Sequence, residues 1–152
     1  FYGDSSPDAQ WQMMAWLVRA ETTMKALGVQ RSFLYSMAGQ KPAGQTNHQM
    51  LEHDGSIKPV LAGRAVLASL IDGAELVEVT HPEQGIDAYQ FRRNDGQTVT
   101  IIWSADGKQH ALPVEAGKRY LDMLGNPIDA ADEVAVGAHP LYLVDKPRME
   151  KN

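Results

Sequence analysis

The pattern of hydrophobic residues changes character near residue 73 of this 152-residue chain. Before that point, apolar residues recur at the three- and four-residue spacing that predicts amphipathic helices. They are Met13, Leu17, Ala20, Met24 and Leu27 in one segment and Val60, Leu67 and Ile71 in another. Ser6 and Pro7 are helix start signals and Gly28 is a stop signal. Pro59 and Gly73 bound the second helix in the same way, so it should run from Pro59 to about Ile71.

The segment between these helices, residues 29–37, reads VQRSFLYSM, with three large apolar residues in succession. A run without polar alternation predicts a short strand buried on both faces, as in a parallel sheet. Residues 38–56 follow as a polar loop that is long for a simple connector. Long loops after buried strands often hold functional residues.

The second half consists of short strand-like runs separated by turn residues. The predicted strands are 74–80, 86–93, 98–103, 109–114, 120–124 and 141–144. The Asp-Gly pairs at 95–96 and 106–107 predict two hairpin turns. Val99, Ile101 and Trp103 alternate with Thr98 and Thr100, which predicts one buried and one solvated face. These runs predict an antiparallel β-sandwich.

Composition narrows the classes of function. The chain is 43% hydrophobic, has a formal net charge of -5 and contains no cysteine. A disulfide framework is therefore excluded, and no cluster of basic residues points to nucleic acid or to an anionic membrane. No apolar run approaches the roughly 20 residues that span a bilayer. Phe1 is not a translation start, so we expect a segment upstream of it.

The first 72 residues do not predict a fold that is complete by itself. A buried parallel strand needs neighbouring strands, and only one convincing strand precedes residue 73. The order helix, strand, loop, helix fits the end of an α/β barrel, which takes roughly 250 residues in total. We therefore expect residues 1–72 to be the C-terminal portion of a (β/α)8 barrel and residues 73–152 to be a β-sandwich accessory domain.

Residues 9–39 and 48–74 resemble the carboxyl end of the barrel in clan A glycoside hydrolases. The resemblance rests on Gly28-Val29, the aromatic strand Phe33-Leu34-Tyr35, and the pairs Asp54-Gly55 and Lys58-Pro59. Residues 91–107 (FRRNDGQTVTIIWSADG) and 139–144 (HPLYLV) are similar to the small β-sandwich that follows the barrel in family 39.

The resemblance implies a retaining glycoside hydrolase, which uses two carboxyl groups about 5 Å apart and no cofactor. Both catalytic glutamates would precede Phe1, so none is expected in this chain, and this fragment alone should be inactive. The expected partners are a polysaccharide or oligosaccharide substrate and the remainder of the barrel. A periplasmic or secreted location follows only from the resemblance.

Three residues of the predicted strand and loop are candidates for substrate binding. Tyr35 lies near the carboxyl end of the strand, where barrel enzymes place functional side chains and where its ring could stack on a sugar. Asn47 and His48 offer donors and acceptors for sugar hydroxyl groups. Each also has an ordinary structural explanation: barrel packing for Tyr35, loop structure for Asn47 and His48.

Other groups of histidine and acidic residues give weaker evidence for a functional site. The five histidines show no metal-ligand spacing, and Asp129, Asp132 and Glu133 match no calcium loop, so no metal site is expected. Asp54 is explained by turn chemistry. The alternative function is a non-catalytic module whose sandwich binds carbohydrate or a protein. Exposed coplanar aromatic residues on the sandwich would favour that alternative.

Overall fold

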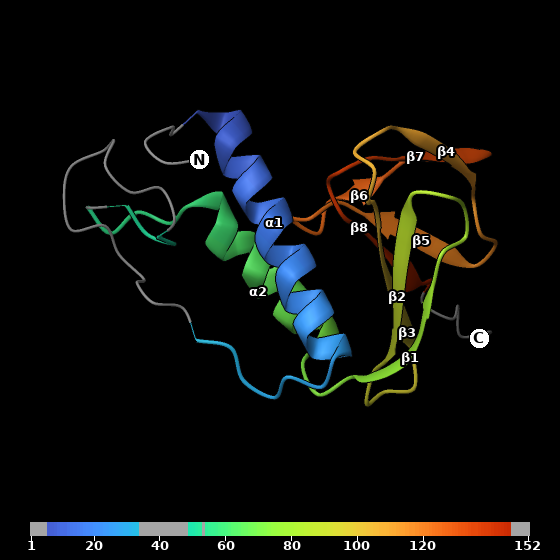
Figure 1. The fold of residues 1–152 in the computed structure, drawn as a ribbon, viewed down its shortest axis with the longest axis horizontal. Coiled ribbons are helices and arrows are strands. Elements are labelled where there is room, and N and C mark those ends of the chain that lie inside the picture. The colour runs from blue at the N-terminus through green and yellow to red at the C-terminus, as the bar shows by residue number, and fades with distance from the viewer. Residues whose placement is uncertain (1–5, 34–48, 53, 147–152) are drawn as a thin grey trace, which may run out of the picture. The chain divides into compact units, whose positions relative to one another are not determined.

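The structure is a computed structural model that describes residues 6–33, 49–52 and 54–146. The chain divides into two compact units, Phe1–Ser69 and Leu70–Asn152. We call them the first and second unit and describe each by itself. The first contains α1 (Pro7–Ala26) and most of α2 (Pro59–Ile71), and the second contains eight strands within the described residues (Figure 1).

The start and stop signals of both helices are confirmed. The Ser6 side chain caps α1 by accepting a hydrogen bond from the Ala9 amide at 3.3 Å, and Pro7 is the first helical residue. After α1, Gly28 adopts φ 82°, a left-handed conformation that favours glycine. Helix α2 has the predicted bounds, and its predicted inward residues Val60, Leu67 and Ile71 are buried.

The predicted apolar stripe of α1 is only partly right: Leu17 is buried, whereas Met13, Ala20 and Met24 are half-buried. The buried residues are Ala9, Met14, Ala15, Leu17, Val18 and Thr22, whereas Leu27 is 79% exposed. Met14, Val18 and Thr22, at intervals of four residues, mark the centre of the buried face. This centre is displaced by one residue from the predicted stripe, which began at Met13. Met13 adjoins Met14 and Leu17 adjoins Val18, so the apolar band is broad, and its pattern alone did not select the packed face.

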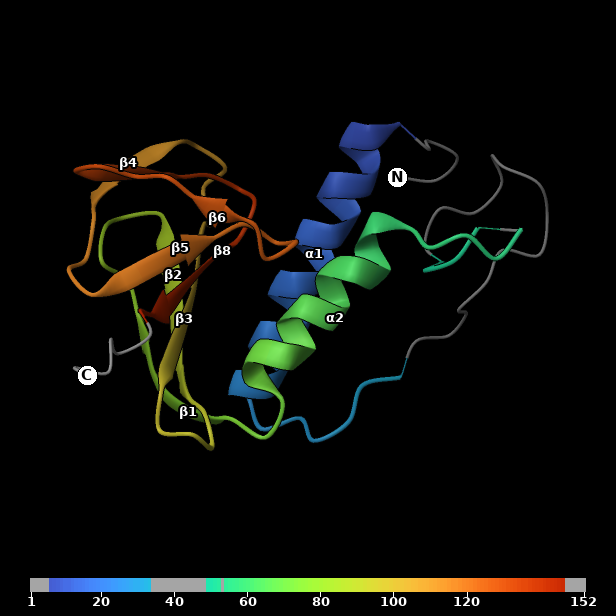
Figure 2. The same ribbon diagram turned by 180° about the vertical axis from the view of Figure 1, so that it is seen from behind.

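The two helices lie side by side in both views (Figure 1, Figure 2). Arg64 Nε of α2 donates to Glu21 Oε1 of α1 at 2.8 Å. Ser32 Oγ reaches the same carboxylate oxygen at 3.4 Å. One glutamate therefore links α1, α2 and the segment that follows α1.

The predicted buried strand over residues 29–37 is not found in its described part. Residues 29–33 have no regular secondary structure, and Phe33 is 87% exposed. A strand buried on both faces requires neighbours on both edges, and the described residues of the first unit supply none. Residues 34–37 lie outside the described residues.

The second unit contains two antiparallel sheets. The larger has the order β1-β2-β3-β8-β5-β6, and the smaller pairs β4 with β7 (Figure 2). The bounds are β1 Glu75–Thr80, β2 Ile86–Arg92, β3 Thr98–Ser104, β4 His110–Pro113, β5 Lys118–Leu121, β6 Pro127–Ile128, β7 Glu133–Val136 and β8 Leu141–Asp145. This sheet-rich arrangement agrees with the predicted sandwich, and β6 and β7 were not predicted.

The predicted solvated face of β3 is only partly solvated, because Thr98 and Thr100 are half-buried. Val99, Ile101 and Trp103 are buried on one face, and Ile102 is buried on the other. Ile102 belongs to a core cluster that joins the large sheet to β4 and β7. Its members are Ile86, Ala88, Ile102, Leu112, Tyr120, Val134, Val136, Leu141 and Leu143.

The turn at Asn94-Asp95-Gly96 joins β2 to β3 as a hairpin, as predicted, with Gly96 at φ 80°. The turn at Asp106-Gly107 is not a hairpin, because β4 pairs with β7 and not with β3. It is a corner between the two sheets. Asp106 Oδ1 holds this corner by accepting from Ser104 Oγ at 2.8 Å and from the Lys108 amide at 2.9 Å.

Strand β1 is the edge strand next to β2, and all six of its residues are exposed. Its register shifts between Leu76 and Glu78, which places a β-bulge at Val77. Leu76, Val77 and Val79 are each about 40% exposed.

A cluster of three polar residues ties together β3, β8 and β5. Asp145 accepts from the Thr98 amide and from Lys118 Nζ, each at 2.8 Å, and Lys118 Nζ also donates to Thr98 Oγ1 at 2.8 Å. The hydrogen bond from Lys118, followed by that from the Thr98 amide, holds the pKa of Asp145 below its usual value.

We expect this cluster to make stability depend on acid pH. A carboxyl group whose pKa is lower in the folded than in the unfolded protein stabilises the fold at pH values above its unfolded pKa of about 3.9. This stabilisation is lost as the pH falls through the folded pKa. Asp145→Asn should lower the free energy of unfolding at pH 7 by up to about 1 kcal/mol, given its exposure, with the difference shrinking below about pH 4. Urea unfolding from pH 7 to pH 2 measures this. The exposed Asp129→Asn is the control, and a constant difference at all pH values would contradict the assignment.

Two buried tyrosines differ in how their hydroxyl groups are satisfied. Tyr120 OH accepts from the Glu115 amide at 2.9 Å. No described group hydrogen-bonds to Tyr142 OH, although the side chain is fully buried. This burial raises the pKa of Tyr142.

Removing each hydroxyl should therefore have a different effect. Tyr120→Phe should lower the free energy of unfolding by about 1 kcal/mol, because the Glu115 amide loses its acceptor. Tyr142→Phe should leave stability unchanged or raise it by up to about 1 kcal/mol, because it removes a buried group without a described partner. Parallel urea denaturation measures both, and equal losses would contradict the distinction.

Candidate functional site

The sequence-predicted site residues Tyr35, Asn47 and His48 lie outside the described residues. Their assignment stays a prediction. The described part of their loop is its base, residues 49–52 and 54–58, immediately before α2.

The base of the loop folds back on itself as a short hairpin. Leu51 and Ile57 form an antiparallel bridge, the Glu52 amide donates to Ser56 O at 2.9 Å, and the Lys58 amide donates to Met50 O at 3.0 Å. These bonds hold the two sides of the hairpin together, and the hairpin directly precedes α2 in the sequence.

The tip of this hairpin confirms that Asp54 acts as a turn residue. Asp54 Oδ1 accepts from the Ser56 amide at 2.9 Å, and Gly55 adopts φ 84°. This local bond is the chemistry by which aspartate favours turns. Glu52 and Asp54 are thus accounted for without a catalytic carboxylate pair.

Lys58 is only 4% exposed, and its Nζ lies 3.7 Å from Glu52 Oε2. The lysine directly precedes Pro59, the first residue of α2, so its buried side chain connects the hairpin to the start of the helix. The motif Lys58-Pro59 therefore has a structural explanation.

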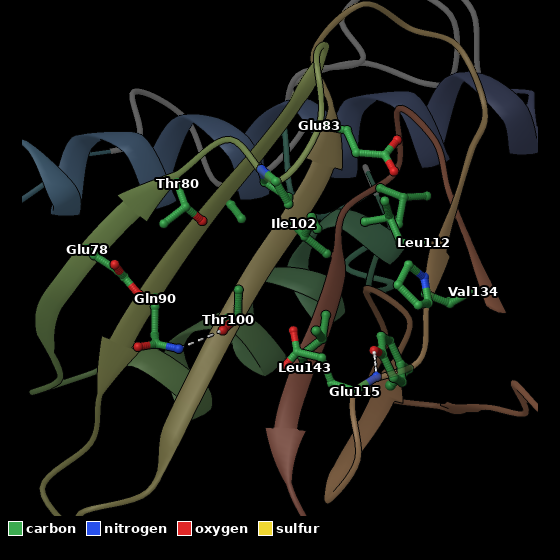
Figure 3. Close-up of a pocket in the computed structure, with 15 residues that line it drawn as sticks. Glu78, Thr80, Glu83, Gln90, Thr100, Ile102, Leu112, Glu115, Val134 and Leu143 are labelled. Atoms are coloured by element: carbon green, nitrogen blue, oxygen red, sulfur yellow. Dashed lines mark hydrogen bonds between the residues drawn. The ribbon is translucent and has the colours of Figure 1, made fainter. Parts of the chain in front are cut away.

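The second unit contains a cleft of about 480 Å³ between its two sheets (Figure 3). This volume falls in the range of about 300–1,000 Å³ that is typical of small-molecule sites. One wall is formed by the large sheet and the other by β4, β7 and the residues after β4. Pro82 and Glu83, from the turn between β1 and β2, line it as well.

The wall formed by the large sheet presents one continuous cross-strand row. Glu78 pairs with Gln90, Gln90 with Thr100, Thr100 with Leu143, and Leu143 with Tyr120. All five line the cleft. The row is polar on β1, β2 and β3 and apolar on β8, so it changes from a polar to an apolar surface across the sheet (Figure 3).

The opposite wall is mostly apolar. Leu112 of β4 and Val134 and Val136 of β7 face the large sheet as members of the core cluster. Glu115, just after β4, adds a carboxylate at the rim. None of the described residues that line the cleft is basic.

A second polar group lies near Glu83. His110 Nε2 is 3.0 Å from Asp106 Oδ1, and His110 Nδ1 is 3.9 Å from Glu83 Oε2. The hydrogen bond from His110, together with those from the Lys108 amide and Ser104, holds the pKa of Asp106 well below its usual value. Asp106 lies between the histidine and the serine, so this arrangement does not place a base beside a nucleophile.

Sequence reasoning missed the cleft, although one signal was present. Thr100 is a polar residue between the buried Val99 and Ile101, and Gln90 is a polar residue next to the buried Phe91, which marks each as pointing away from its buried neighbours. The long-range pairing that aligns them with Glu78, and the opposite sheet, cannot be obtained from that alternation. Within the described ranges, no group of three potential metal ligands is found, and no helix is long and apolar enough to cross a membrane.

The fold is similar to that of a family 39 glycoside hydrolase from the gut symbiont Bacteroides cellulosilyticus WH2. The match has a TM-score of 0.71 at 23% identity and covers 88% of this chain, a share greater than either unit alone could provide. It covers 30% of that protein, so this chain spans less than a third of its length. The resemblance stated from the motifs is confirmed at the level of the fold.

Two other structures match more weakly. A maltooligosyl trehalose synthase matches with TM-score 0.39 and 24% identity over 57% of this chain and 11% of its own. A candidate α-galactosidase/melibiase from Bacteroides fragilis NCTC 9343 matches with TM-score 0.44 and 12% identity over 90% of this chain and 28% of its own. No protein-family model and no curated protein sequence matches the chain.

The turn at the base of the loop can be tested directly. Gly55→Ala should lower the free energy of unfolding by about 1–2 kcal/mol, because a Cβ is unfavourable at φ 84°. Gly55→Asn should lose less, since asparagine tolerates this conformation better. Thermal unfolding of both variants against wild type measures the effect. An alanine variant as stable as wild type would contradict the turn geometry.

Proposed function

We propose that this chain is the C-terminal part of a retaining glycoside hydrolase that acts on a polysaccharide or oligosaccharide. The observation that carries the proposal is the fold match to a family 39 glycoside hydrolase over 88% of the chain. In this proposal, residues 1–72 are the last part of a (β/α)8 barrel and residues 73–152 are its β-sandwich accessory domain.

The two catalytic glutamates would lie upstream of Phe1. In retaining hydrolysis, one carboxylate attacks the anomeric carbon to form a glycosyl-enzyme intermediate, while the other first protonates the leaving group and then activates water. This chain would contribute a rim of the substrate site through Tyr35, Asn47 and His48. The hairpin 49–58 would hold the end of that loop against α2, which is how the described residues support the proposal.

The alternative, a non-catalytic sandwich module with an aromatic binding platform, has less support. Phe91, Trp103, Tyr120 and Tyr142 are buried. Tyr89 stacks on Trp103, with ring centroids 4.9 Å apart and planes 13° apart. The described aromatic side chains of the second unit therefore pack within the protein and do not form an exposed coplanar row.

The proposal predicts that Tyr35 matters for catalysis in the complete enzyme. Tyr35→Ala should lower kcat/KM on aryl glycosides by about 10-fold, the size of one lost aromatic contact of about 1.5 kcal/mol. Tyr89→Phe, a change in the second unit, is the control and should leave kcat/KM unchanged. Steady-state kinetics measures both, and unchanged kinetics for Tyr35→Ala would reject its role.

The reaction class has its own test. NMR of the first-formed product should show retention of anomeric configuration in the complete enzyme, and the 152-residue chain alone should release no product. Inversion, or full activity of this chain alone, would overturn the proposal.

A further inference from the structure

We propose that the cleft between the two sheets of the second unit binds an uncharged oligosaccharide, as a subsite separate from the loop that contains Tyr35. The ligand class rests on the proposed function, whereas the site rests on the geometry of the cleft. The site lies wholly within the second unit and is built from described residues.

The lining of the cleft combines polar and apolar side chains. A pyranose ring has hydroxyl groups around its edge and C–H groups on its faces, so it suits a cleft with one polar and one apolar wall. Here Glu78, Gln90 and Thr100 form the polar part of the lining (Figure 3). The apolar part, which includes Leu112 and Val134, belongs to the buried core cluster beside it. Pockets with mostly apolar linings and a few placed polar groups are typical of small-molecule sites.

The polar row has the spacing and the chemical groups that an oligosaccharide requires. Neighbouring strands lie about 4.8 Å apart, so successive side chains of the row are separated by roughly the width of one sugar ring. A carboxylate, an amide and a hydroxyl together offer both donors and acceptors, as sugar hydroxyl groups require.

The hydrogen bond that Gln90 and Thr100 of the row make with each other is weak. Gln90 Nε2 reaches Thr100 Oγ1 at 3.5 Å, which is at the long limit for a hydrogen bond. Both side chains are half-buried. Ligand hydroxyl groups at shorter distances would improve on this contact.

The charge of the cleft selects among glycans. The lining includes Glu78, Glu83 and Glu115 and, among the described residues, no lysine, arginine or histidine. A uronate would meet the like charges of Glu78 and Glu115, and the carboxylate of Glu83 already has His110 Nδ1 at 3.9 Å. The cleft should therefore bind neutral glycans and reject acidic ones.

The test is an amide NMR titration of the 152-residue chain with cellohexaose and xylohexaose as neutral probes and hexagalacturonate as the anionic probe. A neutral probe should shift the amides of β1, β2, β3 and β7, and hexagalacturonate should not. Failure of both neutral probes to bind, shifts confined to residues 1–69, or equal binding of hexagalacturonate would overturn the proposal.

Two variants locate the binding within the cleft. Gln90→Leu and Thr100→Val keep side-chain size and strand preference, and each should raise the Kd for the neutral probe by about 3- to 10-fold, as expected for one lost hydrogen bond. Gln97→Leu, an exposed position in the β2–β3 hairpin, is the matched control and should leave the Kd unchanged. Equal Kd values for all three variants would overturn the proposal, with thermal unfolding confirming that each is folded.

The outcomes are separable from those of the proposed function. Hydrolysis of a small aryl glycoside by the complete enzyme tests the hydrolase assignment, whereas the Kd of Gln90→Leu for the neutral probe tests the cleft. Absence of hydrolysis in the complete enzyme would reject the hydrolase assignment and leave the NMR result on the cleft standing by itself.

Discussion

Strand β3 is the constraint on which the second unit depends, because it is paired on both edges and packed on both faces. It pairs with β2 along its whole length and with β8 from Val99 to Ile102. Three features of the unit begin on it: Thr98 anchors the cluster with Asp145, Thr100 lines the cleft, and Ser104 holds the corner through Asp106. A residue shift in its register would move all three to the wrong face at once.

The cleft follows from the unequal widths of the two sheets. Two strands cannot cover six, so the face of β1, β2 and β3 extends beyond β4 and β7. Under the small sheet the facing residues are apolar, as at Ile102 and Leu143, whereas beyond it they are Gln90 and Glu78. The row thus changes from apolar to polar where the small sheet of β4 and β7 ends. This is expected for a sheet face that is partly buried and partly exposed to solvent.

Local sequence signals predicted most of the helices and strands. The features that they missed depend on pairing between strands that are far apart in the sequence. Pro59 and Gly73 bounded α2 correctly because caps act within one turn of the helix. The four-residue β7 was missed, and the turn after β3 was taken for a hairpin, because both depend on the pairing of His110 with Val136 across 26 residues. The strand predicted over residues 29–33 is not found. A strand needs neighbouring strands, and a local sequence pattern does not show whether they are present. The polar row of the cleft depends on the alignment of three strands, which the sequence pattern does not give. The roles of Tyr35, Asn47 and His48 remain predictions.

The bulge at Val77 bears on self-association. An exposed edge strand with apolar side chains such as Leu76 and Val79 is a template on which a second copy could add a strand. The bulge interrupts the even spacing of amide and carbonyl groups on that edge, and Glu75 and Glu78 place like charges where two copies would meet. This bulge therefore disfavours the addition of a further strand at the edge where the chain enters the sandwich.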